Sequence, residues 1–280
     1  MNKKNYALIG YKLEHSVSPF IHNRLFEISK INADYSLLSI SSEQLKSNIN
    51  FLNELDGYNV TAPHKVSIMS YLSNINSDAK SYGSVNTVKN AQISTGFNTD
   101  VYGFFETLKF ERINVENDIV ILGYGGVARA IAARCAQLSI GVTLAVRKES
   151  LFKAMELKRK MNLKNVKVCT ADDLKLQKGK IGMLVNATPV GTFPQKDALP
   201  IGLDIIKKCD IIFDLIYNPL ETKLIKQARA LGIKVVNGLS MLVFQALLAQ
   251  KIWNNVVFDE SDIKNLMADC KKKIKDMGQI

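Results

Sequence analysis

Apolar and polar residues alternate in blocks through the first hundred residues. Short apolar runs at 5–11, 34–40 and 57–62 predict strands, and segments at 18–28 and 41–55, where apolar residues recur every three or four positions, predict helices. Two β-rich runs around a polar turn predict a hairpin at 84–98. A βα series that ends in antiparallel strands indicates a mixed sheet.

Three residues set the expected boundaries of these elements. Ser18 is expected to cap the first helix and Pro19 to occupy its first position, because a serine hydroxyl accepts a free backbone N–H there and proline lacks one. Pro63 is expected to end the strand at 57–62, since it cannot donate to a sheet ladder. The residues from 63 to 72 then show helical spacing.

From residue 101 the pattern becomes a regular series of apolar runs and helical segments. The runs are typical of strands buried on both faces of a parallel sheet, and they lie at 118–123, 141–146, 166–170, 181–188, 209–217 and 233–238. Helices are predicted at 101–110, 240–253 and 259–275. No flexible linker divides the sequence, so we expect the helices near 99–110 and 240–253 to join two α/β lobes.

Composition limits the class of protein. The chain has 280 residues, 47% hydrophobic and 22% charged, which suits a soluble globular protein. No apolar run is long enough for a membrane helix, and the run within the first residues, "MNKKNYALIGY", is too short for the core of a signal peptide. Four scattered cysteines show no zinc-ligand spacing, which indicates a reduced, cytoplasmic protein without a metal. The net charge of +11 is spread along the chain, so a solvated surface that attracts small anions is favoured over a nucleic-acid interface.

A glycine-rich stretch follows the strand predicted at 118–123. The sequence "VILGYGGVARAIA" places Gly123, Gly125 and Gly126 between that strand and a helix, with Ala128 three residues after Gly125. Small residues let the backbone approach a pyrophosphate, and the helix N-terminus supplies N–H donors and partial positive charge. Within a regular βα series this pattern predicts a dinucleotide site, and the alternative is a glycine turn needed only for packing.

The end of the next strand indicates which dinucleotide is bound. In "LAVRKESL" no acid ends the strand, and Arg147 and Lys148 stand where the 2′-phosphate of NADP would lie. Glu149 follows directly and could accept from the 2′-hydroxyl of NAD. The sequence therefore favours NADP and leaves NAD as the alternative.

Small polar residues gather beside the predicted strand ends of the first lobe. Hydroxyls, amides and a Lys–Asp pair suit a small polyhydroxylated ligand that carries a carboxylate. Structural alternatives exist: Asn86 could satisfy a turn, Asp100 could cap a helix, and Lys65 could extend into water. Of the three histidines, only His64 lies beside this lysine. The polar residues are Ser16, Ser18, Asn59, Thr61, Lys65, Asn86, Thr99 and Asp100.

Eight motifs carry a family resemblance that covers nearly the whole chain. In order they are "HSVSPFIHN", "YNVTAPHK", "GSVNTV", "FNTD", "GYGGVARA", "VNATPVGTFP", "DLIYNPLETKL" and "NGLSMLVFQA". With them the sequence resembles the shikimate dehydrogenase family. The resemblance implies an α/β protein with two lobes joined by helices: a mixed-sheet substrate-binding domain at 1–101 plus 239–280 and a Rossmann NADP-binding domain at 102–238. It also implies NADP-dependent reduction of 3-dehydroshikimate to shikimate, in aromatic amino acid biosynthesis, by a monomer or homodimer.

The resemblance implies residue roles as well. Lys65 and Asp100 match the catalytic pair, which also binds substrate, and Ser16 and Ser18 match the serines that hold the substrate carboxylate. Further substrate contacts are implied for Thr61, Asn86, Tyr217 and Gln245. Cofactor contacts are implied for Gly123, Gly125, Gly126, Val127, Arg147, Lys148, Ala187, Thr188, Gly238 and Met241.

The sequence departs from the family pattern at three places. The usual "NVTVPFK" is "NVTAPHK", with Ala62 and His64; Val101 replaces a frequent glycine; and "VRK" replaces "NRT" at 146–148. Two alternatives remain beside NADP-dependent shikimate dehydrogenase. One is NAD-dependent oxidation of quinate, and the other is a non-catalytic module that binds a nucleotide and a small acid. The presence of both Lys65 and Asp100 disfavours the second.

Overall fold

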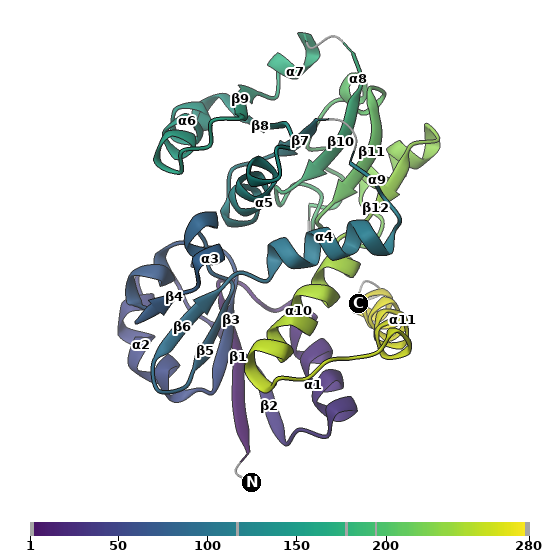
Figure 1. Cartoon of the computed structure of the whole chain (residues 1–280). Coiled ribbons are helices and arrows are strands. Elements are labelled where there is room, and N and C mark those ends of the chain that lie inside the picture. Colours follow the sequence, from purple (N-terminus) through teal and green to yellow (C-terminus); the bar gives the residue numbers. More distant parts are fainter. Residues whose placement is uncertain (1–2, 116–117, 177–178, 194, 278–280) are drawn as a thin grey trace. The chain divides into compact units, whose positions relative to one another are not determined.

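The chain divides into two compact units. The computed structural model describes residues 3–115, 118–176, 179–193 and 195–277. The first unit comprises Met1–Phe104 with Leu242–Ile280, and the second comprises Phe105–Met241. Both divisions fall inside helices, α4 (Asp100–Phe110) and α10 (Leu239–Asn254), which can be followed in Figure 1. The sequence places the divisions slightly earlier, after residues 101 and 238.

The first unit contains a six-stranded mixed sheet in the order β2-β1-β3-β5-β6-β4. Strands β2, β1 and β3 run parallel, while β3–β5 and β5–β6 pair antiparallel. The mixed sheet and the hairpin predicted from the sequence are confirmed. Besides α4 and α10, the elements are β1 (Lys4–Gly10), α1 (Ser18–Ser29), β2 (Ala33–Ser39), α2 (Leu45–Glu54), β3 (Gly57–Val60), the 3₁₀ helix η1 (Ser67–Tyr71), β4 (Asn74–Ile75), α3 (Ser77–Tyr82), β5 (Thr87–Asn90), β6 (Ser94–Phe97) and α11 (Glu260–Met277).

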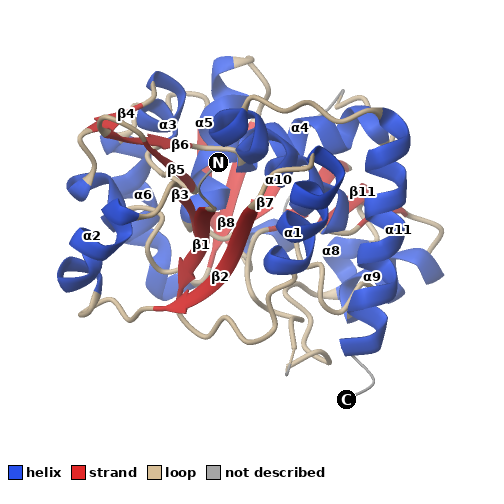
Figure 2. Ribbon diagram, turned by 90° about the horizontal axis from the view of Figure 1, so that it is seen from below, coloured by secondary structure: helices blue, strands red, loops and turns tan. Residues whose placement is uncertain are grey.

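The alternation of side chains along β1 divides the core of this unit in two. Ala7 and Ile9 pack with residues of α2, η1 and α3. Tyr6 and Leu8 pack on the opposite face with residues of α1 and α10, among them Trp253. Figures 1 and 2 show α2 and α3 on one side of the sheet and α1 and α10 on the other. Because helices cover both faces, the ends of the strands are the natural place for a ligand.

The second unit contains a six-stranded parallel sheet in the order β12-β11-β10-β7-β8-β9. Every residue of β7 and β8 is buried, so their continuous apolar runs arise from strands covered on both faces. The elements are β7 (Ile119–Leu122), α5 (Gly126–Gln137), β8 (Val142–Val146), the 3₁₀ helix η2 (Lys148–Ser150), α6 (Leu151–Lys160), β9 (Val166–Thr170), α7 (Asp173–Leu176), β10 (Ile181–Asn186), α8 (Leu203–Ile206), β11 (Cys209–Asp214), α9 (Lys223–Ala230) and β12 (Lys234–Val236).

The strand order explains where this unit can bind a ligand. From β7 the strands run outward to β9, and from β10 they run outward in the opposite direction to β12. Right-handed crossovers then place the helices of the two halves on opposite faces, and α7, α8 and α9 pack together on one of them. The reversal between β7 and β10 is the switch point at which Rossmann domains bind nucleotides. The Rossmann arrangement predicted from the sequence is therefore confirmed.

Two local predictions are wrong. Ser18 does not cap α1, because the helix begins at Ser18 itself and Pro19 takes the second position. The hydroxyl of Ser16 instead accepts from the Ser18 N–H at 3.3 Å. Residues 63–72 form a turn followed by η1, and the hydroxyls of Ser67 and Ser70 donate to carbonyls three residues earlier, in competition with an α-helical ladder. The short β4 and α3 have no counterpart among the predicted elements.

None of the helices within the described ranges combines the length and the apolar composition that crossing a bilayer requires. The four cysteines carry free thiols. Burial raises the pKa of the thiols of Cys135, Cys209 and Cys270 to about 12, so these groups stay neutral at physiological pH. The described residues contain no cluster of three or more His, Cys, Asp or Glu side chains that could hold a metal ion.

Candidate active site

The topology of the first unit brings its polar loops to one edge of the sheet. Strands β1 and β3 run parallel, and β6 lies antiparallel to β5, which is itself antiparallel to β3. The ends of β1, β3 and β6 and the start of β5 therefore lie at the same edge. The polar residues that adjoin these four strand ends are Ser16, Ser18, Thr61, Lys65, Asn86 and Asp100.

A shielded ion pair lies at this edge. Lys65 belongs to the turn after β3, and Asp100 is the first residue of α4. The Lys65 Nζ atom donates to Asp100 Oδ2 at 2.8 Å, and the two side chains are only 14% and 8% exposed. Charges with so little access to water persist only when they are paired and hydrogen-bonded. The pairing argues against the alternative that Lys65 simply extends into water.

Asn86 completes the bonding of the carboxylate. Its Nδ2 atom donates to Asp100 Oδ1 at 2.9 Å and to Thr99 Oγ1 at 2.9 Å, while its Oδ1 atom accepts from the Thr99 N–H at 2.6 Å. The Thr99 hydroxyl donates to Gln245 Oε1 of α10 at 3.2 Å. The side-chain oxygen of Asn98 caps α4 by accepting from the Val101 N–H. Both oxygens of Asp100 therefore accept from the side chains of Lys65 and Asn86 and not from the helix backbone. We call Lys65, Asn86, Thr99, Asp100 and Gln245 the cluster.

The remaining substrate candidates lie in different settings. Ser16 is half-buried and Ser18 is buried, and the bond between them holds the turn that precedes α1. Thr61 directly follows β3, and its N–H donates to the Ile9 carbonyl at the end of β1. Tyr217 belongs to the second unit, where it follows β11. The structure thus links Lys65, Asn86, Asp100 and Gln245 by hydrogen bonds and leaves Ser16 and Ser18 as a separate group.

His64, a departure from the family pattern, is fully buried. Its Nε2 atom lies 2.7 Å from the Ile40 carbonyl oxygen. A carbonyl only accepts, so Nε2 carries the proton. The bond ties the turn that contains Lys65 to the segment after β2. The histidine therefore has a structural contact that phenylalanine could not make.

The glycine-rich loop of the second unit has the geometry expected of a nucleotide cradle. Gly123 follows β7 with φ near 103°, Gly125 precedes the first residue of α5, and Gly126 and Val127 form its first turn. A Cβ atom on Gly125 would meet no atom within 4 Å, so packing within the protein does not require glycine there. The Nε atom of Arg129, in the same turn, is buried without a hydrogen-bond partner among the described residues. An anionic group at this helix N-terminus fits both observations.

Arg147 and Lys148 follow β8, next to this loop in the sheet order. The Nε atom of Arg147 lies 3.2 Å from Glu149 Oε1, and the two side chains are 82% and 66% exposed. The acid that could favour NAD is therefore engaged with the arginine that could favour NADP. Exposed pairs of this kind contribute roughly 0–1 kcal/mol, so a bound phosphate could displace the contact.

The other cofactor candidates follow β10 and β12. Ala187 and Thr188 come after β10, where both the N–H and the hydroxyl of Thr188 donate to Asn186 Oδ1. A Cβ atom on Gly238 would lie 2.1 Å from the Leu215 carbonyl oxygen, so close backbone packing requires glycine at this position. Met241 lies in the first turn of α10 and is buried.

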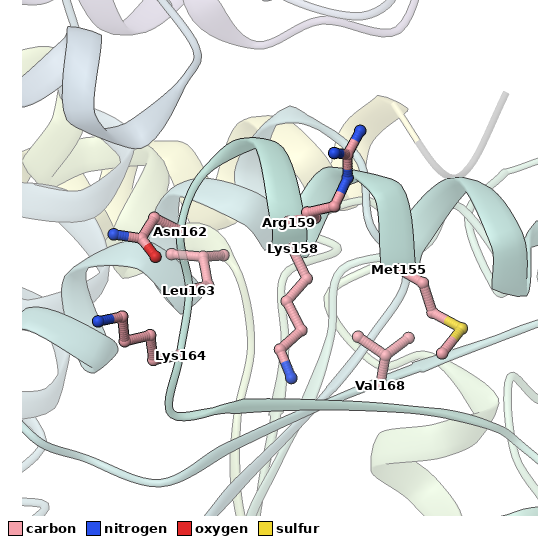
Figure 3. Close-up of a pocket in the computed structure, with 7 residues that line it drawn as sticks. All are labelled: Met155, Lys158, Arg159, Asn162, Leu163, Lys164 and Val168. Carbon is pink, nitrogen blue, oxygen red and sulfur yellow. The ribbon is translucent and has the colours of Figure 1, made fainter.

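An open hollow of about 360 Å³ lies between α6 and β9 (Figure 3). Its basic lining residues are Lys158, Arg159 and Lys164, and Met155 and Val168 supply apolar surface. Figure 3 shows the three basic side chains pointing in different directions. Because their charges do not converge on a common point, the hollow agrees with the solvated basic surface expected from the net charge of +11.

Sequence reasoning assigned no role to Thr87 and Tyr35, although Thr87 bonds directly to Asn86 of the cluster and Tyr35 is joined to Thr87 through Asn59. A signal was available in Asn59. It stands inside a short strand flanked by Tyr58 and Val60, and a buried amide in such a strand requires several hydrogen-bond partners.

Comparisons with known proteins agree with this geometry. A family model described as the shikimate dehydrogenase substrate binding domain matches residues 8–88. The protein named shikimate dehydrogenase (NADP(+)) from Caldanaerobacter subterraneus is 37% identical over 263 residues, which cover 92% of this chain and 94% of that protein. The crystal structure of shikimate dehydrogenase 1 from Peptoclostridium difficile has a TM-score of 0.89 at 34% identity, over 97% of this chain and 99% of that one.

A further solved relative contains ligands. The shikimate 5-dehydrogenase from Thermus thermophilus, in complex with NADP(H) and shikimate, has a TM-score of 0.84 at 28% identity and covers 95% of this chain and 99% of that one. Similarity of sequence and fold thus extends through both units. The chain belongs to the shikimate dehydrogenase family.

Proposed function

We propose that this protein is an NADP-dependent shikimate dehydrogenase, which reversibly reduces 3-dehydroshikimate to shikimate in aromatic amino acid biosynthesis. The observation that carries the proposal is the shielded Lys65–Asp100 pair, with Nζ and Oδ2 2.8 Å apart, at the strand edge of a chain in this family. Reduction of a ketone requires a group that delivers a proton to the oxygen, and a positioned ammonium can do so.

The substrate assignments follow the chemistry of each group. Ser16 and Ser18 are assigned to the substrate carboxylate, since their hydroxyls can donate to it and Ser18 starts α1, where the helix N-terminus favours an anion. Thr61, Asn86 and Gln245 are assigned to the ring hydroxyls, which need both donors and acceptors. A substrate hydroxyl at Asn86 would share an Nδ2 hydrogen that serves Thr99 or Asp100 in the structure. The assignment of Tyr217 to the substrate rests on the family resemblance alone.

In the proposed mechanism Lys65 is the proton donor. Bound NADPH supplies the hydride to the ketone carbon. Negative charge develops on the carbonyl oxygen, and the Lys65 ammonium stabilises this charge and gives the oxygen a proton, which completes the hydroxyl of shikimate. Asp100 holds the ammonium through Oδ2 and is itself held by Asn86 through Oδ1. General acid–base catalysis of this kind contributes roughly 10²–10⁴ in rate.

The residues present in the second unit fit NADP. The backbone from Gly123 to Val127 would hold the pyrophosphate, and Arg147 and Lys148 would hold the 2′-phosphate. Charge-assisted bonds to a phosphate contribute roughly 1.5–3 kcal/mol each, which exceeds the contribution of an exposed pair such as Arg147–Glu149. Ala187, Thr188, Gly238 and Met241 are assigned to the rest of the cofactor.

Oxidation of quinate with NAD is the second candidate, because Glu149 lies beside the arginine that would read the phosphate. Initial rates of nicotinamide reduction with shikimate or quinate, each with NADP⁺ or NAD⁺, decide between the two. We expect shikimate with NADP⁺ to give the highest kcat/KM. Absence of reduction with all four pairs would contradict the proposed function, and preference for quinate with NAD⁺ would support the alternative.

We also propose that the enzyme is cytoplasmic and acts as a monomer or homodimer on small molecules without nucleic acid. Free thiols at all four cysteines support a reducing compartment. Sedimentation analysis measures the oligomeric state, and a defined species larger than a dimer would contradict this proposal. Binding to DNA at physiological salt would contradict the exclusion of nucleic acid.

A further inference from the structure

A series of buried hydrogen bonds extends from the catalytic pair into the core of the first unit. Behind Asp100 and Asn86, the Thr87 hydroxyl lies 3.2 Å from Asn86 Oδ1. The Asn59 Nδ2 atom donates to Thr87 Oγ1 at 2.9 Å, and the Tyr35 hydroxyl donates to Asn59 Oδ1 at 2.7 Å. We call Tyr35, Asn59 and Thr87 the relay. Thr87 is fully buried, so it cannot touch a substrate itself.

The register of the sheet assembles the relay. Asn59 of β3 and Thr87 of β5 are directly opposite each other, and Tyr35 stands on β2, separated from β3 by β1. The same face of the sheet otherwise carries an apolar cluster that includes Tyr6 and Trp253. Polar groups in such surroundings cost free energy unless they are fully hydrogen-bonded. A row of them that leads to the active site indicates a role beyond packing.

Donors and acceptors in the relay follow one direction. The Tyr35 O–H occupies Asn59 Oδ1, so the two hydrogens of Asn59 Nδ2 serve the Asn86 carbonyl oxygen at 3.2 Å and Thr87 Oγ1 at 2.9 Å. The hydrogen of Thr87 is then available to Asn86 Oδ1. Asn59 therefore holds the start of β5 at two points, the backbone of Asn86 and the side chain of Thr87.

The same order of donors and acceptors continues from Asn86 towards Asp100. The Oδ1 atom of Asn86 accepts from Thr99 N–H and from Thr87, which fills both lone pairs. The Thr99 hydroxyl accepts from Asn86 Nδ2 and lies 3.2 Å from Gln245 Oε1, Asn86 Oδ1 and Thr87 Oγ1. With Asn86 Oδ1 filled and the Thr87 hydrogen directed to Asn86, the hydrogen of the Thr99 hydroxyl serves Gln245. The second hydrogen of Asn86 Nδ2 serves Asp100 Oδ1. Each polar hydrogen of these side chains thus has an acceptor, and the last bond of the series is the one from Asn86 to the Asp100 carboxylate.

We propose that the Tyr35 hydroxyl is a positioning group for the reaction: through Asn59 and Thr87 it fixes Asn86, and with it the Lys65–Asp100 pair. The inference rests on the proposed dehydrogenase function. A fully satisfied buried network is rigid, and catalysis requires side chains held within a fraction of an ångström. The Tyr35 ring also stacks on His22, with centroids 4.3 Å apart, and Tyr35→Phe keeps this ring while it removes the hydroxyl.

Steady-state kinetics with shikimate and NADP⁺ test the relay. We expect Tyr35→Phe to lower kcat about threefold and Thr87→Val, which breaks the relay beside Asn86, to lower it about tenfold. Thr87→Ser keeps the hydroxyl and should retain wild-type kcat. The KM for NADP⁺ should stay unchanged in all three, since the relay lies in the first unit. The losses of kcat in the double variant Tyr35→Phe/Thr87→Val should be less than additive, because the Tyr35 hydroxyl acts in part through Thr87 and in part through the bond from Asn59 to the Asn86 carbonyl.

Tyr6→Phe is the matched control. Tyr6 is paired with Tyr35 in the register of β1 and β2, is equally buried, and donates its hydroxyl to Asn254 Oδ1 of α10 at 3.0 Å instead of to the relay. It should lose thermal stability as Tyr35→Phe does but keep wild-type kcat. Equal kcat for Tyr6→Phe and Tyr35→Phe, or fully additive losses in the double variant, would overturn the proposal.

Hydrogen exchange, which does not depend on enzyme turnover, tests the relay independently of the proposed function. The Thr99 N–H donates to Asn86 Oδ1 at 2.6 Å, so its hydrogen exchange reports how firmly Asn86 is held. We expect faster exchange at Thr99 in Tyr35→Phe than in wild type or Tyr6→Phe. If the wild-type protein were inactive with every substrate, the dehydrogenase function would be refuted. The comparison of hydrogen exchange at Thr99 would still show whether the relay holds Asn86. If Thr87→Val fails to fold, the comparison of Tyr35→Phe with Tyr6→Phe decides alone, and equal exchange in the two overturns the inference.

Discussion

Asp214, the last residue of β11, carries a buried charge whose effect on stability can be measured. Its carboxyl group is fully buried and accepts from the Thr222 hydroxyl at 2.6 Å, from Asn186 Nδ2 at 3.0 Å and from the Ile216 N–H at 3.2 Å. Burial raises the pKa of Asp214 from 3.8 to about 6, although the three hydrogen bonds act in the opposite direction. Asn186 in turn holds Thr188, a proposed cofactor residue.

The sign of the effect follows from proton binding. Between pH 3.8 and about 6 the unfolded chain has lost the Asp214 proton while the folded protein still holds it. The free energy of unfolding therefore falls as the pH rises through this window and is constant with respect to this group above and below it. A shift of about two units corresponds to about 3 kcal/mol at 1.36 kcal/mol per unit.

Urea unfolding of wild type and Asp214→Asn from pH 3.5 to 8 measures this contribution. Other carboxyl groups titrate in both proteins, so their effects cancel in the difference. We expect wild type to lose about 3 kcal/mol relative to Asp214→Asn between pH 3.5 and 7 and almost nothing further above that pH. The constant offset between the two proteins reports the changed hydrogen bonds and carries no information on the pKa.

Asp210 supplies the control on the same strand. It pairs with Lys180 at 3.2 Å, and its side chain is 40% exposed. Asp210→Asn removes one carboxylate from the same strand outside the buried Asp214 site and is the matched variant for loss of a negative charge. A difference between wild type and Asp214→Asn that does not vary with pH would refute the reasoning, because it would mean that the folded and unfolded states bind the Asp214 proton equally.

Three further predictions concern the active site. Lys65→Met should lower kcat by roughly 10²–10⁴ with unchanged NADP⁺ affinity, and addition of Asp100→Asn should restore part of the stability lost in urea unfolding, because it removes an unpaired buried carboxylate. Arg147→Ala should raise the KM for NADP⁺ about tenfold or more and leave that for NAD⁺ nearly unchanged; equal changes would show that Arg147 does not contact the phosphate. Ser16→Ala and Ser18→Ala should both raise the KM for shikimate, and only Ser16→Ala should also lower the melting temperature, since its hydroxyl accepts the Ser18 N–H. An unchanged KM in both serine variants would place the substrate carboxylate elsewhere.

The strands of the second unit could be predicted from the sequence because their apolar runs are continuous and recur in a regular series with helical segments. The apolar run at 166–170 coincides with β9, and the runs at 118–123 and 141–146 contain β7 and β8. Other short elements depend on single polar contacts, which leave no hydrophobic pattern in the sequence. The six-residue α3 starts where Asn76 accepts from Asp78 N–H. The helix predicted at 41–55 begins only at Leu45, because the Gln44 side chain bonds back to the Ser41 N–H and closes a turn.

The candidate active site was harder to predict than the secondary structure, because its residues come together only when distant strands pair. The residues alone suggested a Lys–Asp pair but left Lys65 and Asp100 each with a structural alternative, and the family resemblance favoured the pair. Their contact arises from strand register: Asn59 lies opposite Thr87, and Thr87 lies opposite Phe97, so the loops after β3 and β6 reach the same edge. Hydrophobic periodicity specifies which face of a strand is buried but not which strands are neighbours. The relay through Tyr35 was unpredictable for the same reason.

His64 shows how a departure from the family pattern can be accommodated without loss of the site. The imidazole is fully buried, and its Nε2–H donates to the Ile40 carbonyl, which follows β2. Phenylalanine at this position would leave that carbonyl without the bond, while histidine leaves its own Nδ1 atom without a partner within the described part of the chain. The two residues thus exchange one unsatisfied buried group for another. Because the bond anchors the backbone next to Lys65 while Asp100 anchors its ammonium, the proposed catalytic lysine is held at both ends.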